Sequence, residues 1–267
     1  MKINDPAFDI KNGEFTGGSY STDDVTIPTS IYIPKAYDHD KKYALLIYFH
    51  NIGGRGDTPY WSGDQGNILV KNVIELTNDN VIVFAPRCPT EYFWVDTPYA
   101  PGIYDFDKTP VSKVMRAVIS YIENEILAKY SVDTSRVWAF GDSLGGGATW
   151  DLLLRKPDLL AAAIPVASYC DPTQAENIPE NIAIWAFHTA QDKSVSVNGI
   201  RALMPKLAAF RRNVKYTEYD SADPDHKALF NGAWEKSKNW EHWAWVPAYN
   251  DIATARWLVS QAKPTCL

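Results

Sequence analysis

Five short apolar runs, interspersed with longer helical patterns, constrain the fold of this chain more than any other feature. They occupy residues 43–50, 81–86, 136–141, 160–168 and 182–188. A continuous apolar run of this length is typical of a strand buried on both faces, as the strands of parallel sheets are. The alternation therefore predicts an α/β chain with a mostly parallel central sheet and helices on both faces.

Further segments extend this pattern. Residues 24–34 alternate with period two and predict an early, half-exposed strand, whereas the alternation in 214–219 indicates a strand nearer an edge. Helices are expected over residues 111–127, 146–157, 197–212 and 251–263. Pro205 predicts a kink or a late start in the third of these helices.

The 267 residues suit one α/β domain, and we find no linker that would divide 1–267 into two. Residues 94–110 are polar, aromatic and rich in proline, which favours a loop over a functional site.

Net charge and apolar length limit the partners. The formal charge is −6 with no basic cluster, so neither nucleic acid nor an anionic membrane surface is expected as a partner. No apolar run approaches the roughly 18 residues of a membrane span. The N-terminal residues lack a signal peptide, which indicates a cytoplasmic protein or one whose signal has been removed.

Cys88, Cys170 and Cys266 have no metal-binding spacing and are interpreted as buried small apolar residues.

A serine between glycines marks the candidate catalytic site. Residues 139–147 read AFGDSLGGG, with Ser143 between Gly141 and Gly145 at the end of an apolar run and the start of a helical pattern. Such a strand, turn and helix exposes a nucleophilic hydroxyl and directs the Leu144 N–H toward an oxyanion. The alternative is a serine that caps the helix N-terminus.

A nucleophilic serine needs a histidine base and a carboxylate that orients the base. In hydrolases of this architecture the chain order is serine, acid, histidine. Asp192 follows the apolar run that ends at residue 188 and is the favoured acid, with Asp171 as the alternative. His226 and His242 both follow the last predicted strand, and their spacing does not separate them as candidate bases.

Several pieces of the chain, in order, are similar to α/β-hydrolase esterases of the predicted-peptidase and carboxylesterase group, which are related to feruloyl esterases and polyhydroxybutyrate depolymerases. The pieces include YIPKAYDHDKKYALLIYFHNIGGRGD, SRVWAFGDSLGGGATWDLLLRKPDLLAAAIPVAS, IAIWAFHTAQDKSVSV and HWAWVPAYNDIATARWLVSQ. The family's catalytic histidine begins an H-x-x-W-x-P-A-Y pattern, which His242 begins here. The resemblance thus implies Ser143 as nucleophile, Asp192 as acid and His242 as base. His226 then falls in an apparent insertion near the site, residues 222–240.

One residue departs from the family pattern. The family has His-Gly after its third strand, and this chain has His50-Asn51. Asparagine tolerates a left-handed backbone better than most residues, so we expect the turn to survive. The resemblance implies that the Ile52 N–H is the second oxyanion donor and that His50 orients the loop.

The implied activity is hydrolysis of carboxylic esters through an acyl-enzyme, without metal or cofactor. Aryl esters or esters linked to carbohydrate, as small molecules or on polysaccharide, are the expected substrates because aromatic residues follow the apolar runs at 43–50 and 81–86. The candidate pocket residues are Trp61, Tyr92, Phe93, Trp94 and Tyr104. A serine peptidase, a polyester depolymerase and a catalytically silent carbohydrate-binding protein are the alternatives.

Overall fold

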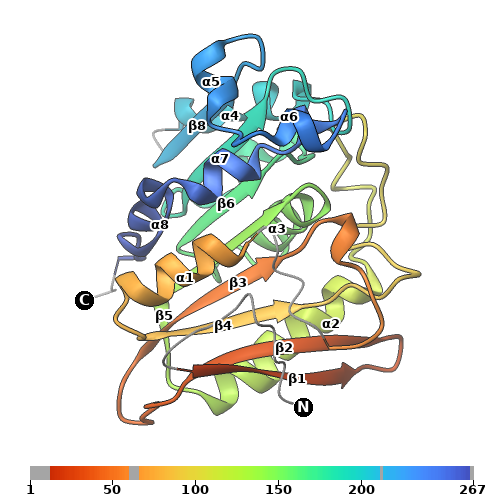
Figure 1. Ribbon diagram of the computed structural model, residues 1–267. Coiled ribbons are helices and arrows are strands. Elements are labelled where there is room, and N and C mark those ends of the chain that lie inside the picture. Colours follow the sequence, from red (N-terminus) through yellow and green to blue (C-terminus); the bar gives the residue numbers. More distant parts are fainter. Residues whose placement is uncertain (1–12, 60–65, 211–212, 265–267) are drawn as a thin grey trace.

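One sheet of eight strands runs through the part of the chain that the computed structural model describes, residues 13–59, 66–210 and 213–264 (Figure 1). Its order is β1-β2-β4-β3-β5-β6-β7-β8. The β1–β2 and β2–β4 pairs are antiparallel, and the remaining pairs are parallel. The strands are β1 (Gly13–Ser21), β2 (Thr26–Pro34), β3 (Tyr43–Phe49), β4 (Val81–Pro86), β5 (Val132–Asp142), β6 (Ala162–Val166), β7 (Ala183–Thr189) and β8 (Val214–Tyr219). The predicted α/β class with a mostly parallel sheet is confirmed.

The first two strands differ from the sequence expectation. β1 was not expected, because its sequence GEFTGGSYS has neither an apolar run nor a regular alternation. β2 is largely buried instead of half-exposed. Its side chains are buried on both sides of the sheet, since Ile31 belongs to one apolar cluster and Tyr32 to the other. β8 is an edge strand, as its alternation predicted.

Helices lie on both faces of the sheet (Figure 1). Those of the described residues are α1 (Asn67–Leu76), α2 (Lys113–Tyr121), α3 (Leu144–Arg155), α4 (Asn198–Ala209), α5 (Pro224–Ala228), α6 (Ala233–Lys236), α7 (Trp245–Asn250) and α8 (Ile252–Val259). Shorter helical turns are η1 (Ile52–Gly54), the π-helical η2 (Ile122–Leu127), η3 (Pro172–Asn177) and η4 (Trp240–His242). The helix α4 begins at Asn198 and continues through Pro205, so the late start is wrong.

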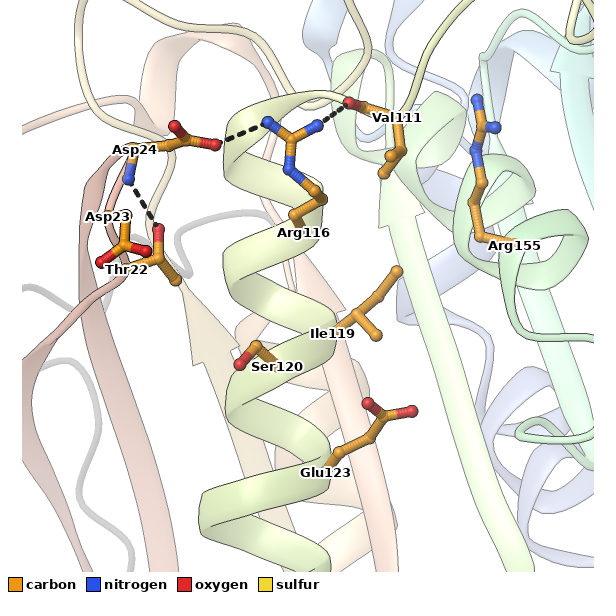
Figure 2. A pocket seen from close by; sticks show the side chains of 9 residues that line it. All are labelled: Thr22, Asp23, Asp24, Val111, Arg116, Ile119, Ser120, Glu123 and Arg155. Carbon is orange, nitrogen blue, oxygen red and sulfur yellow. Dashed lines mark hydrogen bonds and ion pairs between the residues drawn. The ribbon is translucent and has the colours of Figure 1, made fainter.

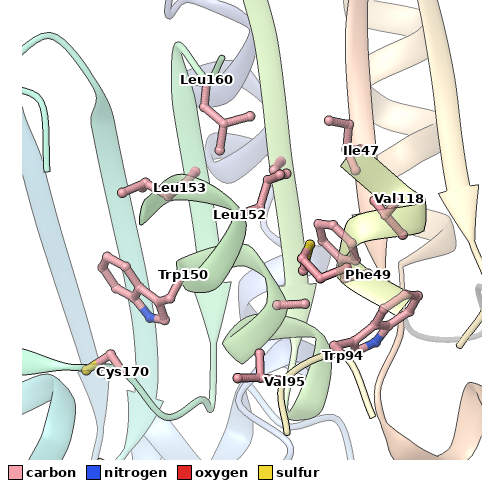
Figure 3. Close-up of a cluster of buried hydrophobic side chains, with 14 of the residues drawn as sticks. Ile47, Phe49, Trp94, Val95, Val118, Trp150, Leu152, Leu153, Leu160 and Cys170 are labelled. Atoms are coloured by element: carbon pink, nitrogen blue, oxygen red, sulfur yellow. The ribbon is translucent and has the colours of Figure 1, made fainter. Parts of the chain in front are cut away.

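The apolar core consists of two clusters, one on each face of the sheet. Side chains of α2, α3 and α4 pack on one face, and side chains of α1, α7 and α8 pack on the other. Figure 3 shows part of the first cluster, in which Leu152 and Leu153 of α3 lie near Trp150 and Leu160. Each fully buried aliphatic side chain contributes roughly 1.5–3 kcal/mol relative to an exposed one. The two clusters hold the strands in place, and the loops at their carboxyl ends are therefore well anchored.

Candidate active site

Ser143 lies at the sharp turn between β5 and α3. Its backbone has φ +54° and ψ −117°, a conformation that residues with a side chain rarely adopt and that costs about 1–3 kcal/mol. The turn requires glycine on both sides: a Cβ on Gly145 would come within 1.9 Å of the Phe49 carbonyl oxygen, and one on Gly141 within 2.4 Å of the Gly145 carbonyl oxygen. The Ser143 side chain does not cap α3, so the interpretation as a capping serine is wrong.

Instead, Ser143 belongs to a chain of hydrogen bonds between three side chains. Its Oγ lies 2.8 Å from Nε2 of His242, and Nδ1 of His242 lies 2.7 Å from Oδ2 of Asp192. Because a carboxylate only accepts, Nδ1 carries the proton and Nε2 is free to accept from the serine hydroxyl. Ser143 and His242 are 5% and 8% exposed, so the pair is largely shielded from water.

The carboxylate of Asp192 lies in the loop after β7 and is held by several donors. Oδ1 accepts from the backbone N–H groups of Ser194 and Val195, at 2.8 Å and 3.0 Å. Burial acts to raise its pKa, but hydrogen bonds from His188 and His242 outweigh burial and lower the pKa to about 2. Asp192 is therefore ionised at neutral pH and can stabilise a protonated His242.

A second histidine contacts this carboxylate, which the sequence analysis missed. His188, at the end of β7, is 1% exposed and places Nε2 3.2 Å from Asp192 Oδ2 and 3.1 Å from the Val195 carbonyl oxygen. Both neighbours are acceptors, so Nε2 carries the proton. The four-residue spacing from His188 to Asp192 indicates only that the two residues lie close together. It does not predict that the imidazole ring faces the carboxylate.

The loop after β3 is ordered by His50. Nε2 of His50 accepts from the backbone N–H of Cys88 at 3.0 Å, so Nδ1 carries the proton and donates to the Asn51 carbonyl oxygen at 2.6 Å. Burial lowers the pKa of His50 to about 4, which keeps the ring neutral and this tautomer in place. The indole of Trp94 donates to the carbonyl oxygen of His50 at 3.1 Å.

Asn51 does not adopt the left-handed conformation that was considered for it. Its backbone is extended, with φ −72° and ψ −177°. Its side chain makes two hydrogen bonds instead: Oδ1 accepts from the N–H of Gly53 at 2.9 Å, and Nδ2 donates to Asp142 at 2.8 Å. A side chain thus organises a turn for which the family uses glycine.

Two backbone N–H groups are candidates for the oxyanion donors. The Leu144 N–H is at the start of α3, where helical N–H groups have no acceptor within the helix. The Ile52 N–H follows Asn51, and neither amide has a hydrogen-bond acceptor among the described residues. The loop and the helix approach closely, since a Cβ on Gly145 would also come within 2.7 Å of the His50 carbonyl oxygen. Both donors therefore remain available at one end of the sheet.

The structure does not bring the alternative acid and base to this site. Asp171 caps η3, where it accepts from Thr173 N at 2.8 Å, and also from Phe106 N at 2.8 Å. His226 lies in α5 and accepts from the N–H of Asp220 at 3.0 Å. Both side chains have local structural roles.

The expected pocket residues have different fates. Trp94 and Tyr104 are 0% and 4% exposed and belong to the apolar core, so neither forms an exposed rim around the site (Figure 3 shows Trp94). Trp94 packs edge-on against Phe49, and Tyr104 packs edge-on against Tyr169. Tyr92 and Phe93 are half-buried at the surface of this cluster. Trp61 lies outside the described residues.

A separate pocket of about 480 Å³ lies between the β1–β2 turn and α2 (Figure 2). Arg116 crosses it and bonds Asp24 and the Val111 carbonyl oxygen, both at 2.8 Å. Arg155, at its edge, donates to the Thr109 carbonyl oxygen. The guanidinium groups therefore already have partners within the protein, and none of the three site residues lines this pocket.

The described residues offer neither a metal site nor a membrane-spanning helix. Their His, Cys, Asp and Glu side chains form no group of three or more that is suited to a metal ion. None of their helices has the length and apolar character needed to cross a bilayer. Cys88 and Cys170 are buried free thiols, as expected, and Cys266 lies outside the described residues.

Comparisons with known proteins bear on the fold. No family model matches the sequence. A thermostable esterase of known structure is 29% identical with a TM-score of 0.77; the match covers 93% of this chain and 63% of the esterase. This chain therefore spans less than two thirds of that protein.

Two more distant structures agree in fold. A feruloyl esterase module from Clostridium thermocellum, solved with sinapinate, is 13% identical with a TM-score of 0.59, covering 96% of this chain and 92% of the module. The acylaminoacyl peptidase of Pyrococcus horikoshii is 11% identical with a TM-score of 0.61, covering 96% of this chain and 43% of the peptidase. The chain has the α/β-hydrolase fold, and its resemblance to α/β-hydrolase esterases is confirmed.

Proposed function

We propose that this protein is a serine hydrolase of carboxylic esters. The observation that carries the proposal is the chain of two hydrogen bonds from Ser143 through His242 to Asp192, at 2.8 Å and 2.7 Å. These distances lie within the reach that nucleophile and base need for proton transfer. The fold shared with an esterase at 29% identity supports the same activity.

The mechanism is acyl transfer in two steps. His242 Nε2 takes the hydroxyl proton as Ser143 Oγ attacks the ester carbonyl carbon, and Asp192 stabilises the imidazolium. The N–H groups of Leu144 and Ile52 bind the oxyanion of the tetrahedral intermediate. That intermediate collapses, the alcohol leaves with the proton from His242, and an acyl-serine remains. Water, deprotonated by His242, then attacks this ester, and the acid is released as His242 returns the proton to Ser143 Oγ.

The proposed substrates are aryl esters or hydroxycinnamate esters linked to carbohydrate. Half-buried aromatic side chains near the site support this class. Tyr92 and Phe93 follow β4, with the Arg55 guanidinium 4.8 Å from the centre of the Phe93 ring. Trp240 begins η4, the turn that ends at His242. The fold similarity to a feruloyl esterase module that binds sinapinate is consistent with an aromatic acyl group.

A substrate panel tests the activity. Wild-type protein is assayed with p-nitrophenyl acetate, methyl ferulate and a peptide p-nitroanilide, next to Ser143→Ala, His242→Ala and His226→Ala. We expect hydrolysis of both esters, loss of activity in the first two variants and full activity in the third. An active His242→Ala variant beside an inactive His226→Ala variant would overturn the assignment of the base.

Covalent labelling separates the remaining alternatives. A fluorophosphonate probe should label wild-type protein and leave Ser143→Ala unlabelled. If the protein is labelled and cleaves the peptide substrate but neither ester, it is a peptidase. The absence of both labelling and hydrolysis, in protein that binds a polysaccharide, indicates a carbohydrate-binding protein and contradicts the proposal.

A further inference from the structure

The two ends of the Asn51 side chain connect the loop after β3 to the turn that carries Ser143. Oδ1 accepts from Gly53 N at 2.9 Å inside the loop. Nδ2 donates to Oδ2 of Asp142, the residue immediately before Ser143, at 2.8 Å. The amide therefore ties two backbone segments that are 91 residues apart in sequence.

The peptide unit between Asn51 and Ile52 is held from its carbonyl side. The Asn51 carbonyl oxygen accepts from His50 Nδ1 at 2.6 Å and from Gly54 N at 3.0 Å. The N–H of the same unit belongs to Ile52. In a trans peptide the C=O and N–H bonds point in opposite directions, so the donors that hold the carbonyl also set the direction of the Ile52 N–H.

The carboxyl group of Asp142 is buried directly beside the nucleophile. It is 0% exposed, and the polar side chains that face it are neutral: the amide of Asn51 and the hydroxyls of Tyr48 and Tyr249. The Tyr48 hydroxyl lies 3.4 Å from Asp142 Oδ1, so the 2.8 Å hydrogen bond from Asn51 is the shorter of these two. A carboxyl group buried without a cation is costly, and burial raises the pKa of Asp142 to about 7. An apolar side chain at this position would avoid that cost.

We propose that Asn51 and Asp142 are a positioning pair that holds the Ile52 N–H in register with Ser143, so that it can bind the oxyanion. The inference rests on the proposed function, because it assigns a role in the acyl-transfer step. It also accounts for the departure from the family's His-Gly pattern. Where the family relies on glycine to shape the turn, this chain uses a side-chain bond to the turn that carries the nucleophile.

Substitutions at both residues can separate positioning from folding. Asn51→Ser keeps an oxygen that can accept from Gly53 N but has no group that reaches Asp142. Asp142→Ala removes the acceptor, whereas Asp142→Asn retains an oxygen that can accept from Asn51 Nδ2. Tyr48→Phe is the matched control, since it removes the hydroxyl that donates to Asp142 Oδ1 and leaves the loop bonds intact.

The readouts are kcat and KM for p-nitrophenyl acetate and the Kd of phenylboronic acid, which forms a tetrahedral adduct with the serine. We expect kcat to fall about 10–100-fold in Asn51→Ser and in Asp142→Ala while KM changes little, because a misplaced donor weakens only the transition state. The Kd of the boronate should rise by a similar factor. Asp142→Asn and Tyr48→Phe should retain wild-type kcat.

The double variant Asn51→Ser/Asp142→Ala should lose no more activity than the worse single variant, because both substitutions break one bond. Multiplicative losses, wild-type kcat in Asn51→Ser, or an equal loss in Tyr48→Phe would each overturn the inference while wild-type hydrolysis upholds the proposed function. Wild-type protein that neither hydrolyses esters nor reacts with the fluorophosphonate would overturn both. Thermal unfolding of each variant identifies any loss of activity that follows from misfolding. If Asp142→Ala is misfolded, the activity of Asp142→Asn decides whether an acceptor for Asn51 is sufficient.

Discussion

Nε2 of His188 lies 3.2 Å from the same Asp192 oxygen that accepts the hydrogen bond of His242. One carboxylate oxygen thus faces two imidazoles, of which only His242 reaches the serine. The second imidazole helps to keep Asp192 ionised and fixes the direction in which the carboxylate points. His188 is therefore a positioning residue that acts through Asp192.

Replacing His188 with phenylalanine should lower kcat/KM about 10-fold or more, because a hydrogen bond to a charged group contributes about 1.5–3 kcal/mol. The phenyl ring fills the buried space, being slightly larger than the imidazole, but donates no hydrogen bond. Steady-state hydrolysis of p-nitrophenyl acetate measures the effect. The control is His226→Phe, whose ring lies outside the site and whose rate should match the wild type. Equal rates in the two variants would exclude a role for His188.

Asp192→Asn should reduce kcat by about 10⁴, since an amide no longer enforces the His242 tautomer in which Nε2 accepts from Ser143. Asp171→Asn is the matched substitution, because that carboxylate caps η3 and should leave kcat unchanged. Single-turnover and steady-state rates of both variants measure the difference. Comparable losses in the two would show that the acid has been misassigned.

Trp94→Phe should destabilise the fold by about 1–3 kcal/mol, because it leaves the buried carbonyl oxygen of His50 without the indole donor. Activity should fall as well, since His50 belongs to the loop that carries the Ile52 N–H. Urea unfolding measures the first effect and kcat the second. Tyr92→Phe serves as control, since its half-buried ring is retained. A fully stable Trp94→Phe variant would show that the indole N–H is dispensable.

The pH dependence of stability should reveal the buried carboxyl group of Asp142. Its pKa is raised from 3.8 to about 7, so between those values the folded protein holds a proton that the unfolded chain releases. The free energy of unfolding therefore falls as pH rises through this window, by an amount on the order of a few kcal/mol. The facing side chains Asn51, Tyr48 and Tyr249 remain neutral there.

Asp142→Asn removes this titration. Its stability relative to wild type should increase between pH 4 and 7 by about that amount and then remain level. Chemical denaturation at a series of pH values measures the difference. If the difference in stability between the variant and the wild type does not change with pH, Asp142 has the same pKa in the folded and the unfolded protein.

The sequence predicted β3 to β7 because each contains a continuous apolar run, and it predicted β8 from its alternation. With the family resemblance it also identified Ser143, Asp192 and His242, whereas spacing alone did not choose between His226 and His242. It did not predict β1, whose Gly-rich segment pairs with β2 mainly through its backbone. Nor did it distinguish Trp94 from Tyr92, since two aromatic residues two positions apart look alike until the core determines which is buried. The roles of His188 and Asn51 depend on where a ring or an amide points, and spacing along the chain carries no such information.

The backbone conformation at Ser143 also bears on how the protein can change over generations. With φ +54° and ψ −117°, the residue occupies a region suited to the first central position of a type II′ turn, where glycine is favoured. A Ser143→Gly substitution removes the nucleophile and relieves the strain at the same time. Natural selection for stability alone would therefore favour an inactive descendant, and continued selection for catalysis is what retains a side chain at this position.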